Sequence, residues 1–448
     1  MKKSKVKILA IALLFGSTFG LYNCTRHDQV LNLNQAGGTE LTSVKTSTPP
    51  SFATGINVWA GADASFWKKA PVLTFTATVP DVEGTNNAFN GFIGNSTTVS
   101  MQSMYDANNV YFLISWKATQ PHMESAPWFF DPLAKVWAQG DAAPTYDVNG
   151  QLTQRSFVDD GFMMMFNINN SDAEFNTKSC FAACHAGEPT LVFDTATGKL
   201  ITTTTNVMRT NAVSEKLDCW IGRFNAVPQI KQLPDYYIDW NGGVAGNDGI
   251  EPDQSVSDGA NPPTYSSNEA TNGTGGIPNI QTLTITGTST TEDVPLYVKP
   301  AGSIYTNASL VCADTLGAAL LVVAVDINGV LTLSNGTTLN PNASTTYQSV
   351  GDGIGNNDPT TWIPGQIVAP YTGGEGDVTA NAVWTGSAWQ LMLKRALKTA
   401  DVLHQDVDFS SLNKVPFGVA VMFCAPGSIN PADNEHAIMS GLTLNFQK

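Results

Sequence analysis

The stretch Val72-Leu-Thr-Phe-Thr-Ala-Thr-Val79 alternates apolar and polar residues. Successive side chains of a strand point to opposite faces of a sheet, so this alternation predicts a half-buried strand. A turn at Tyr105 followed by an apolar run to Lys117 predicts another strand, and so does the run from Asp159 to Ile168. Many short strands separated by turn residues favour an all-β fold, and we expect an antiparallel β-sandwich with short helices.

The composition limits the classes of function. The chain has 448 residues, of which 42% are hydrophobic and 14% charged, enough apolar material to exclude global disorder. Its net charge of -15 is the opposite of what a sequence-independent nucleic-acid binder needs. An anionic membrane surface is an equally poor partner for such a chain. We therefore expect no nucleic-acid partner.

The N-terminus has the pattern of an export signal. Several lysines precede an apolar core from Ile8 to Phe19, which is too short for a membrane span and predicts a signal peptide over residues 1–23. The sequence Leu21-Tyr22-Asn23-Cys24 resembles a lipoprotein box and predicts lipidation of Cys24, although Asn23 stands where a small residue is usual. Ordinary cleavage near Cys24 is the alternative. We expect an exported protein of the periplasm, outer membrane or cell surface, which contacts the membrane through a lipid anchor only.

The rest of the chain divides by composition. Residues 24–50 are polar and predict a tether, and residues 51–448 predict one β domain. An insertion at about 242–300 is rich in turn residues, above all up to Pro278. Its segment from Asn247 to Asp258 offers oxygen ligands without the spacing of an EF-hand, so turn formation is favoured over calcium binding.

The hexapeptide Cys180-Phe-Ala-Ala-Cys184-His185 is the strongest chemical motif. Two thiols can attach one porphyrin edge, and an adjacent imidazole can coordinate the iron, so the motif predicts one covalent haem c with His185 as the proximal ligand. Three residues separate the cysteines instead of the usual two. A disulfide between Cys180 and Cys184, or a metal site, is the alternative. An exported protein meets a compartment in which these reactions occur.

Several residues are candidates for the iron ligand on the other face of the haem. Met208 is the first choice, because it follows a Thr-rich segment soon after the motif. The alternatives are a methionine of the run Met163–Met165, His404, or an open position. Trp220 and Phe181 are candidate walls of the haem pocket, and core packing is their alternative role. A methionine ligand would raise the reduction potential.

Three of the six cysteines remain besides Cys24, Cys180 and Cys184. Cys219, Cys312 and Cys424 are scattered, and they predict either buried thiols or one pair among them. The sequence contains no Ser-His-Asp arrangement, P-loop or dinucleotide fingerprint. We therefore expect an electron carrier more than an enzyme.

An ordered set of fragments resembles a known family. They are the turn and strand at 105–117, the strand at 159–168, Cys184-His185-Ala-Gly, Met208-Arg-Thr210, Asp218-Cys-Trp220, Ile363-Pro-Gly365, Asp377-Val378, Trp389 to Leu397, and Pro416 to Phe423. In order and spacing they are similar to the haem-binding domain typified by the gamma subunit of ethylbenzene dehydrogenase, found beside molybdenum enzymes. The resemblance implies a β-sandwich shaped like carbohydrate-binding modules that holds one haem, with a redox enzyme as partner.

One departure from that family stands after Trp220. The family often has Asp-x-Trp-His-Trp-Lys, whereas this chain continues with Ile221-Gly222-Arg223. Any role of the family's His, second Trp and Lys therefore has no counterpart here.

Together these features predict an exported c-type cytochrome that transfers electrons. Its partner would be a redox protein, either a molybdenum enzyme or another cytochrome. Two other classes stay open: a surface module without haem that binds carbohydrate or mediates adhesion, and a haem sensor or enzyme with an open iron position. The fold alone does not separate these classes.

Overall fold

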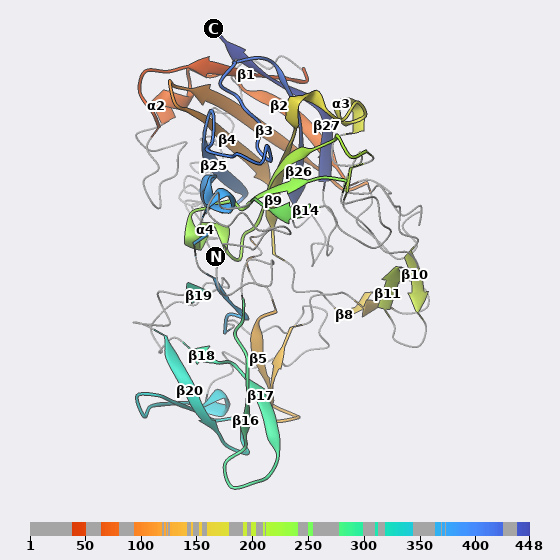
Figure 1. Cartoon of the computed structure of the whole chain (residues 1–448). Coiled ribbons are helices and arrows are strands. Elements are labelled where there is room, and N and C mark those ends of the chain that lie inside the picture. Colours follow the sequence, from red (N-terminus) through yellow and green to blue (C-terminus); the bar gives the residue numbers. More distant parts are fainter. Residues whose placement is uncertain are drawn as a thin grey trace, which may run out of the picture.

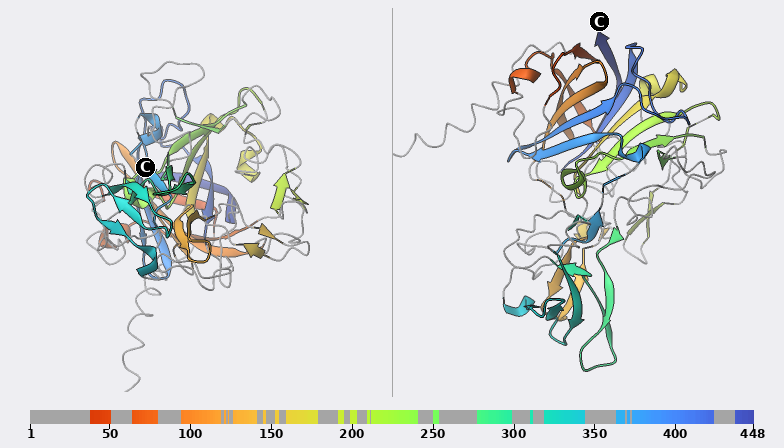
Figure 2. Two further views of the ribbon diagram at one scale, coloured as in Figure 1. Left: turned by 90° about the horizontal axis from the view of Figure 1, so that it is seen from below. Right: turned by 60° about the vertical axis from the view of Figure 1, so that its left-hand side comes forward.

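A computed structural model describes a two-lobed, mostly β protein (Figures 1 and 2). The described residues are 38–50, 64–79, 94–118, 121, 123, 126–140, 145–146, 152–154, 159–178, 191–194, 199–202, 209–210, 212–240, 250–253, 277–298, 310–311, 319–343, 363–368, 370–371, 373–423 and 437–448. In this part of the chain no helix is both long and apolar enough to cross a bilayer.

The larger lobe is built on one 12-stranded sheet. From edge to edge its strands are β14 (Ile250–Pro252), β13 (Asp235–Ile238), β12 (Leu217–Arg223), β9 (Gly161–Asn167), β26 (Val415–Met422), β27 (Ala437–Gln447), β1 (Glu40–Lys45), β3 (Ser96–Tyr105), β4 (Asn109–Lys117), β25 (Ala388–Ala396) and β24 (Thr379–Trp384), while β2 (Leu73–Thr78) pairs with β27 and β3 beside this path.

The large sheet is mixed, which differs from the purely antiparallel arrangement expected from the sequence. β1 runs parallel to both of its neighbours, with Leu41 opposite Leu444 of β27 and Val44 opposite Met104 of β3. β1 also lies inside the segment expected to be a polar tether. It forms a strand because Leu41 and Ser43 alternate inward while the residues between them are less buried.

The sheet folds over so that its two halves enclose the main core, which gives a sandwich-like packing from a single sheet. Aromatic rings bridge the halves: Phe112 of β4 lies 5.9 Å from Trp220 of β12, and Trp116 of β4 lies 5.8 Å from Phe162 of β9. Rings of this size bury large apolar areas, so these contacts hold the halves together.

In two of the predicted strands, the pattern of apolar residues in the sequence matches the burial of their side chains in the structure. β2 alternates buried and less buried residues along Leu73–Thr78, as expected for a strand with one face in the core. All seven residues of β9 are buried, because its apolar run is covered on both faces. The turn before β4 is held by Asp106, whose Oδ1 accepts the N–H groups of Asn108 and Asn109 at 2.7 and 2.8 Å.

The smaller sheets add a second body with a hydrophobic cluster of its own. They are β5 (Trp128–Asp131) with β6 (Val136–Gln139), β16 (Gln281–Thr284) with β17 (Thr291–Val294), the group β18 (Tyr297–Val298), β20 (Leu320–Val325), β21 (Leu331–Leu333) and β22 (Thr338–Leu339), and the group β15 (Ile277–Pro278), β23 (Gln366–Val368) and β19 (Leu310–Val311). Two further pairs are β7 (Thr145–Tyr146) with β8 (Leu152–Gln154) and β10 (Leu191–Asp194) with β11 (Lys199–Thr202).

Segments far apart in the sequence meet in this second body, which Figure 1 shows at the end away from the C-terminus. The indole of Trp128 donates to the carbonyl of Asn279 at 2.7 Å, and the indole of Trp137 donates to the carbonyl of Gly329 at 2.8 Å. The predicted insertion at about 242–300 thus contains ordered strands: β14 extends the large sheet, and β16 to β18 join the second body.

The helices of the described residues are short. They are the α-helices α2 (Ala64–Trp67), α3 (Phe175–Lys178) and α4 (Val227–Ile230) and the 3-10 turns η1 (Ile168–Asn170), η4 (Pro341–Ala343) and η6 (Gly374–Gly376). α4 packs closely on β12 because Gly222 has no side chain. A Cβ at this position would lie 2.5 Å from Leu233 and 2.7 Å from Val227.

Candidate functional site

The predicted haem-attachment residues Cys180, Cys184 and His185 lie outside the described residues, and so do Met208 and Cys24. The same holds for Phe181, Cys312 and Cys424. Their roles therefore stay predictions from spacing and chemistry. The described residues include elements that precede and follow the motif along the chain.

Those flanking elements belong to one half of the large sheet. The chain reaches the motif from α3, which packs against β26 and β27 and buries the ring of Phe175 completely. After β10 and β11, the chain re-enters the sheet at Leu217, the first residue of β12. Phe175 and Leu217 share a small hydrophobic cluster, so the described elements before and after the motif meet on the same face of the sheet.

The methionine run lies in β9, and its side chains alternate between faces as predicted. Met164 packs in the main core, whereas Met163 and Met165 pack with Phe175 and Cys219 on the opposite face. Each of the three methionines is at most 2% exposed. Met163 and Met165 therefore lie on the face that carries α3.

Trp220 is completely buried in the main core. Its ring lies 4.8 Å from Phe166 and 6.3 Å from Phe409, and the guanidinium of Arg395 lies 5.3 Å from its centre. Among the described residues no acceptor meets its indole N–H. These contacts show core packing, and a contact of Trp220 with the haem stays a prediction.

His404 lies in the loop after β25 with an exposed side chain and a left-handed backbone, φ 56°. The turn itself is held by Asp401, whose carboxylate accepts the N–H groups of Leu403 at 2.7 Å and Gln405 at 2.6 Å. His404 is thus presented to solvent by a turn that another residue forms.

The departure from the family's pattern after Trp220 has a steric reason. Gly222 stands where the family has its second Trp, and even a Cβ there would clash with Leu233 and Val227. Arg223 stands where the family has Lys, and its guanidinium donates to the carbonyl of Asp159 at 3.1 Å. In this chain these positions therefore serve the packing of α4 and β9.

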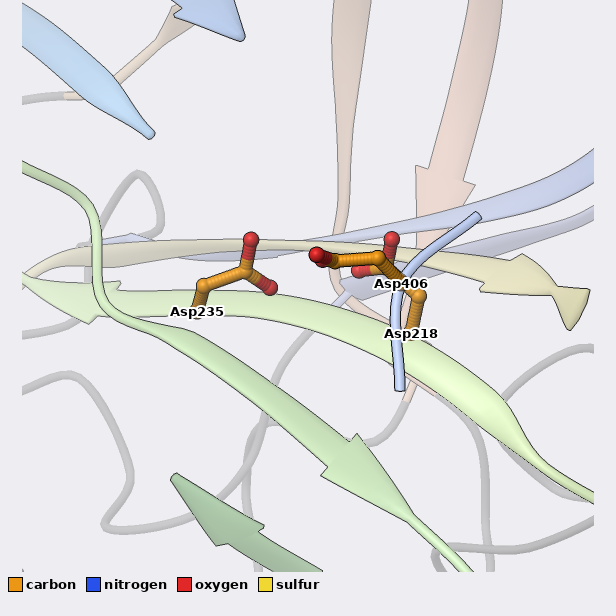
Figure 3. A group of neighbouring side chains, drawn as sticks. All are labelled: Asp218, Asp235 and Asp406. Carbon is orange, nitrogen blue, oxygen red and sulfur yellow. The ribbon is translucent and has the colours of Figure 1, made fainter. Parts of the chain in front are cut away.

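A group of buried charges lies at one end of the core, and the sequence did not predict it. Figure 3 shows Asp218 on β12, Asp235 on β13 and Asp406 from the loop after β25, with the carboxyl group of Asp235 directed toward the other two. One carboxylate oxygen of each lies within 4.8 Å of the others. Asp218 and Asp235 are fully buried, and Asp406 is 8% exposed.

Arg395 of β25 supplies the positive charge in this group. Its Nη2 lies 3.4 Å from Asp218 and forms a close ion pair with Asp406, and its Nε lies 3.5 Å from Asp235. Its Nη1 donates to the carbonyl of Val407 at 2.9 Å, and the Val407 N–H donates to Asp218 at 2.9 Å. The guanidinium thus joins β12 and β13 to β25 and the loop that follows it.

Asp253, which follows β14, adds a fourth carboxylate. Its N–H donates to the carbonyl of Asp235 at 3.0 Å, which continues the pairing of β13 with β14 and places the two residues opposite each other. Asp253 is 4% exposed. We call Asp218, Asp235, Asp253 and Asp406 together the carboxylate cluster.

The cluster has an excess of negative charge. Burial raises the pKa of Asp218, and Arg395 offsets part of that rise. Burial and the neighbouring carboxylates of Asp218 and Asp253 raise the pKa of Asp235 well above its ordinary value. Burial alone would lower the pKa of Arg395, but the surrounding carboxylates raise it overall, so the guanidinium stays charged. One cation therefore faces four acids.

The local sequence did contain a sign of this group. Asp218 stands alone between Leu217 and Cys219, and Arg395 stands between Lys394 and Ala396 after an apolar run. A charged residue inside an otherwise apolar strand is rarely buried unless it is paired. Which residue pairs with which depends on the strand order, and no local pattern gives that order.

No curated protein matches the chain. The family model described as ethylbenzene dehydrogenase matches residues 64–423, which include β12, the carboxylate cluster and the predicted haem motif. Since the match covers most of the chain, this protein belongs to the ethylbenzene dehydrogenase family, whose members are haem-binding subunits.

Proposed function

We propose that this chain is an exported c-type cytochrome that binds one covalent haem and transfers electrons to or from a redox enzyme. The observation that carries the proposal is the sequence Cys180-Phe-Ala-Ala-Cys184-His185 within a chain of a haem-binding family. The family accounts for haem binding, and the two thiols account for a covalent attachment.

The donor set fits the cofactor. Cys180 and Cys184 supply the two thiols that form thioether bonds to one edge of the porphyrin, and His185 supplies an imidazole for the iron. The described elements before and after the motif, α3 and β12, contribute Phe175 and Leu217 to one hydrophobic cluster. When bound, the haem accepts and releases one electron at its iron.

Met208 is our proposed distal ligand, and Trp220 our proposed wall of the pocket. A thioether ligand favours the ferrous iron more than a second imidazole does. Met163 and Met165 are the nearest alternatives in the described structure, because they lie on the face that carries α3. His404, exposed on a loop, is a further alternative.

The partner and the location follow from charge and export signals. A net charge of -15 favours association with a basic surface on a redox protein, such as a molybdenum enzyme or another cytochrome. The signal peptide over residues 1–23 would direct export, and a lipid on Cys24 would hold the mature protein at the periplasmic or outer face of a membrane. Electron carriage at that location is the function that we propose.

A haem stain on a denaturing gel tests covalent attachment. The full chain is produced in a host with c-type maturation, denatured, and stained for haem peroxidase activity. We expect a stained band for the wild type and no band for the double variant Cys180→Ala/Cys184→Ala. Each single variant should retain one thioether or none.

Cys219→Ala is the matched control, because this cysteine is buried in β12 and lies outside the motif. It should stain like the wild type. Haem that is fully removed from the wild type by acidified organic solvent would show non-covalent binding and reject the c-type assignment. A purified wild type without any haem would favour a surface binding module instead.

A further inference from the structure

We propose that the carboxylate cluster binds a hard cation of the calcium class, held by Asp218, Asp235, Asp253 and Asp406 beside Arg395. This site is separate from the haem motif and from the proposed electron transfer. It rests on three features of the described residues: the charge imbalance, the oxygens without donors, and the arrangement of the elements that carry them.

The charge imbalance comes first. Four carboxylates and one guanidinium share a region in which no member is more than 8% exposed. Burying an unpaired carboxylate costs several kcal/mol even after relaxation, so the excess negative charge needs protons or a cation. Arg395 neutralises one charge, which leaves three.

The free oxygens point to a cation. Among the described residues no donor meets Oδ1 of Asp218, either oxygen of Asp235, Oδ1 of Asp253 or Oδ1 of Asp406 apart from the ion pairs with Arg395. Calcium takes six to eight oxygen ligands and accepts carboxylates in irregular geometry. Asp218, Asp235 and Asp406 therefore offer the ligand type that calcium prefers, and one carboxylate oxygen of each lies within 4.8 Å of the others.

Asp253 is the most telling member, because it has no ion pair with Arg395 among the described residues and is 4% exposed. Its N–H donates to the carbonyl of Asp235, so Asp253 and Asp235 stand opposite each other on neighbouring chain segments, and their side chains project to the same face of the sheet. A calcium ion between these two carboxylates would be coordinated by both.

The elements that carry the ligands explain what the cation would do. Asp218 lies in β12, Asp235 lies in β13, Asp253 directly follows the neighbouring strand β14, and Asp406 comes from a loop whose N–H groups are fixed by Asp401. A bound cation would link β12, β13 and the end of the edge strand β14 to the loop after β25. β12 is also the strand to which the segment with the haem motif returns, so this link would stiffen one support of the haem.

Calcium titration of the purified full chain tests the site. Metal content is measured by elemental mass spectrometry before and after treatment with a chelator, and the melting temperature is measured with calcium chloride or magnesium chloride. We expect one calcium per chain and a rise in melting temperature of about 5 °C at calcium well above its dissociation constant. Magnesium should give a smaller rise, because it requires stricter octahedral geometry.

The variants Asp253→Asn and Asp258→Asn locate the cation. Asp253→Asn should abolish the calcium-dependent rise, while Asp258→Asn, in the same segment of the chain, should keep it. A rise that is lost in Asp258→Asn and kept in Asp253→Asn would place calcium elsewhere and overturn the proposal. A wild type without bound metal, whose melting temperature is the same with calcium or chelator, would show that shared protons balance the cluster.

If Asp253→Asn does not fold, the metal content and the calcium response of the wild type still decide whether a cation binds. The lanthanide ion terbium, which has a radius similar to that of calcium, then competes for the site and reports ligation by luminescence excited through nearby aromatic rings. Absence of both the calcium response and the terbium signal would overturn the proposal. The haem stain is unaffected by any of these outcomes, so the cation site and the cytochrome proposal fail independently.

Discussion

Arg395 and Asp406 form an ion pair that the surrounding strands remove almost completely from solvent. The guanidinium lies at the end of β25, and the carboxylate lies in the loop that follows. Asp406 also accepts a hydrogen bond from the hydroxyl of Thr399, so its position is fixed from a second side. Through Arg395, β25 also contacts Asp218 of β12 and Asp235 of β13.

Removing the arginine should therefore be costly. Arg395→Met leaves the carboxylate cluster without its only cation among the described residues, and we expect a loss of about 3–5 kcal/mol in the free energy of unfolding, the usual cost of breaking a buried pair. Urea denaturation at neutral pH measures the loss.

The exposed pair of Lys414 and Glu40 is the matched control. Its charged atoms lie 2.5 Å apart, but the side chains are 59% and 43% exposed. We expect Lys414→Met to cost less than about 1 kcal/mol, because exposed ion pairs contribute little. Equal losses in the two variants would contradict the central role of Arg395.

Glu375 predicts a dependence of stability on pH. It lies in η6, is 2% exposed, and its Oε2 has no donor among the described residues. Burial raises its pKa to about 8 from an ordinary value of 4.5. The folded protein therefore keeps a proton that the unfolded chain has lost, and stability should fall as the pH rises from about 5 to about 8 and then level off.

Glu375→Gln should remove part of that fall, about 1.4 kcal/mol for each unit of pKa shift. The measured quantity is the difference between variant and wild type in urea denaturation at several pH values, because the carboxylate cluster shifts in the same direction. Glu40→Gln is the control: hydrogen bonds from Lys414 and Asn445 lower the pKa of Glu40, so it should leave the dependence above pH 5 unchanged. Parallel curves for wild type and Glu375→Gln would contradict the assignment.

The sequence predicted the parts of the fold that depend on neighbouring residues. The alternation in β2 and the apolar run of β9 gave two strands, because burial on one face or on both leaves a periodic trace. The parallel pairing of β1 left no such trace, because Leu41 meets Leu444 across almost the whole chain.

For the candidate sites, too, the part that depends on neighbouring residues could be predicted from the sequence, and the part that depends on strand order could not. Cys180, Cys184 and His185 are neighbours in the sequence, so their spacing alone indicates haem chemistry. The carboxylate cluster joins residues from four separate segments, and only the register of β12, β13 and β14 brings Asp218, Asp235 and Asp253 together. The second body was missed for the same reason, because Trp128 packs with strands more than a hundred residues away.

The lipid anchor predicts the distribution of the protein between phases. If Cys24 is acylated, the wild type should partition into the detergent phase of a Triton X-114 separation, and Cys24→Ser should move to the aqueous phase. β1 begins at Glu40, so residues 25–39 would allow a reach of about 50 Å from the membrane when fully extended. A wild type found entirely in the aqueous phase would contradict acylation and leave an exported protein without an anchor.

The distal haem ligand gives the sharpest spectroscopic prediction. A thioether bound to ferric haem produces a weak charge-transfer band near the red edge of the spectrum, and it favours the ferrous state. We expect this band in the wild type, and we expect Met208→Ala to lose it together with a fall in reduction potential. Absorption spectra and redox titration of the same samples measure both effects.

Met164→Leu and Met165→Leu complete that experiment. Met164 is enclosed in the main core, so its replacement by a residue of similar volume should leave the band unchanged. Met165 lies on the face that carries α3, next to Phe175. A band that survives Met208→Ala and disappears in Met165→Leu would transfer the ligand role to β9.

A low-spin ferric spectrum without the band would favour His404, and a high-spin spectrum with rapid cyanide binding would show an open iron position. In that last case catalysis or gas sensing would replace electron transfer as the function to test.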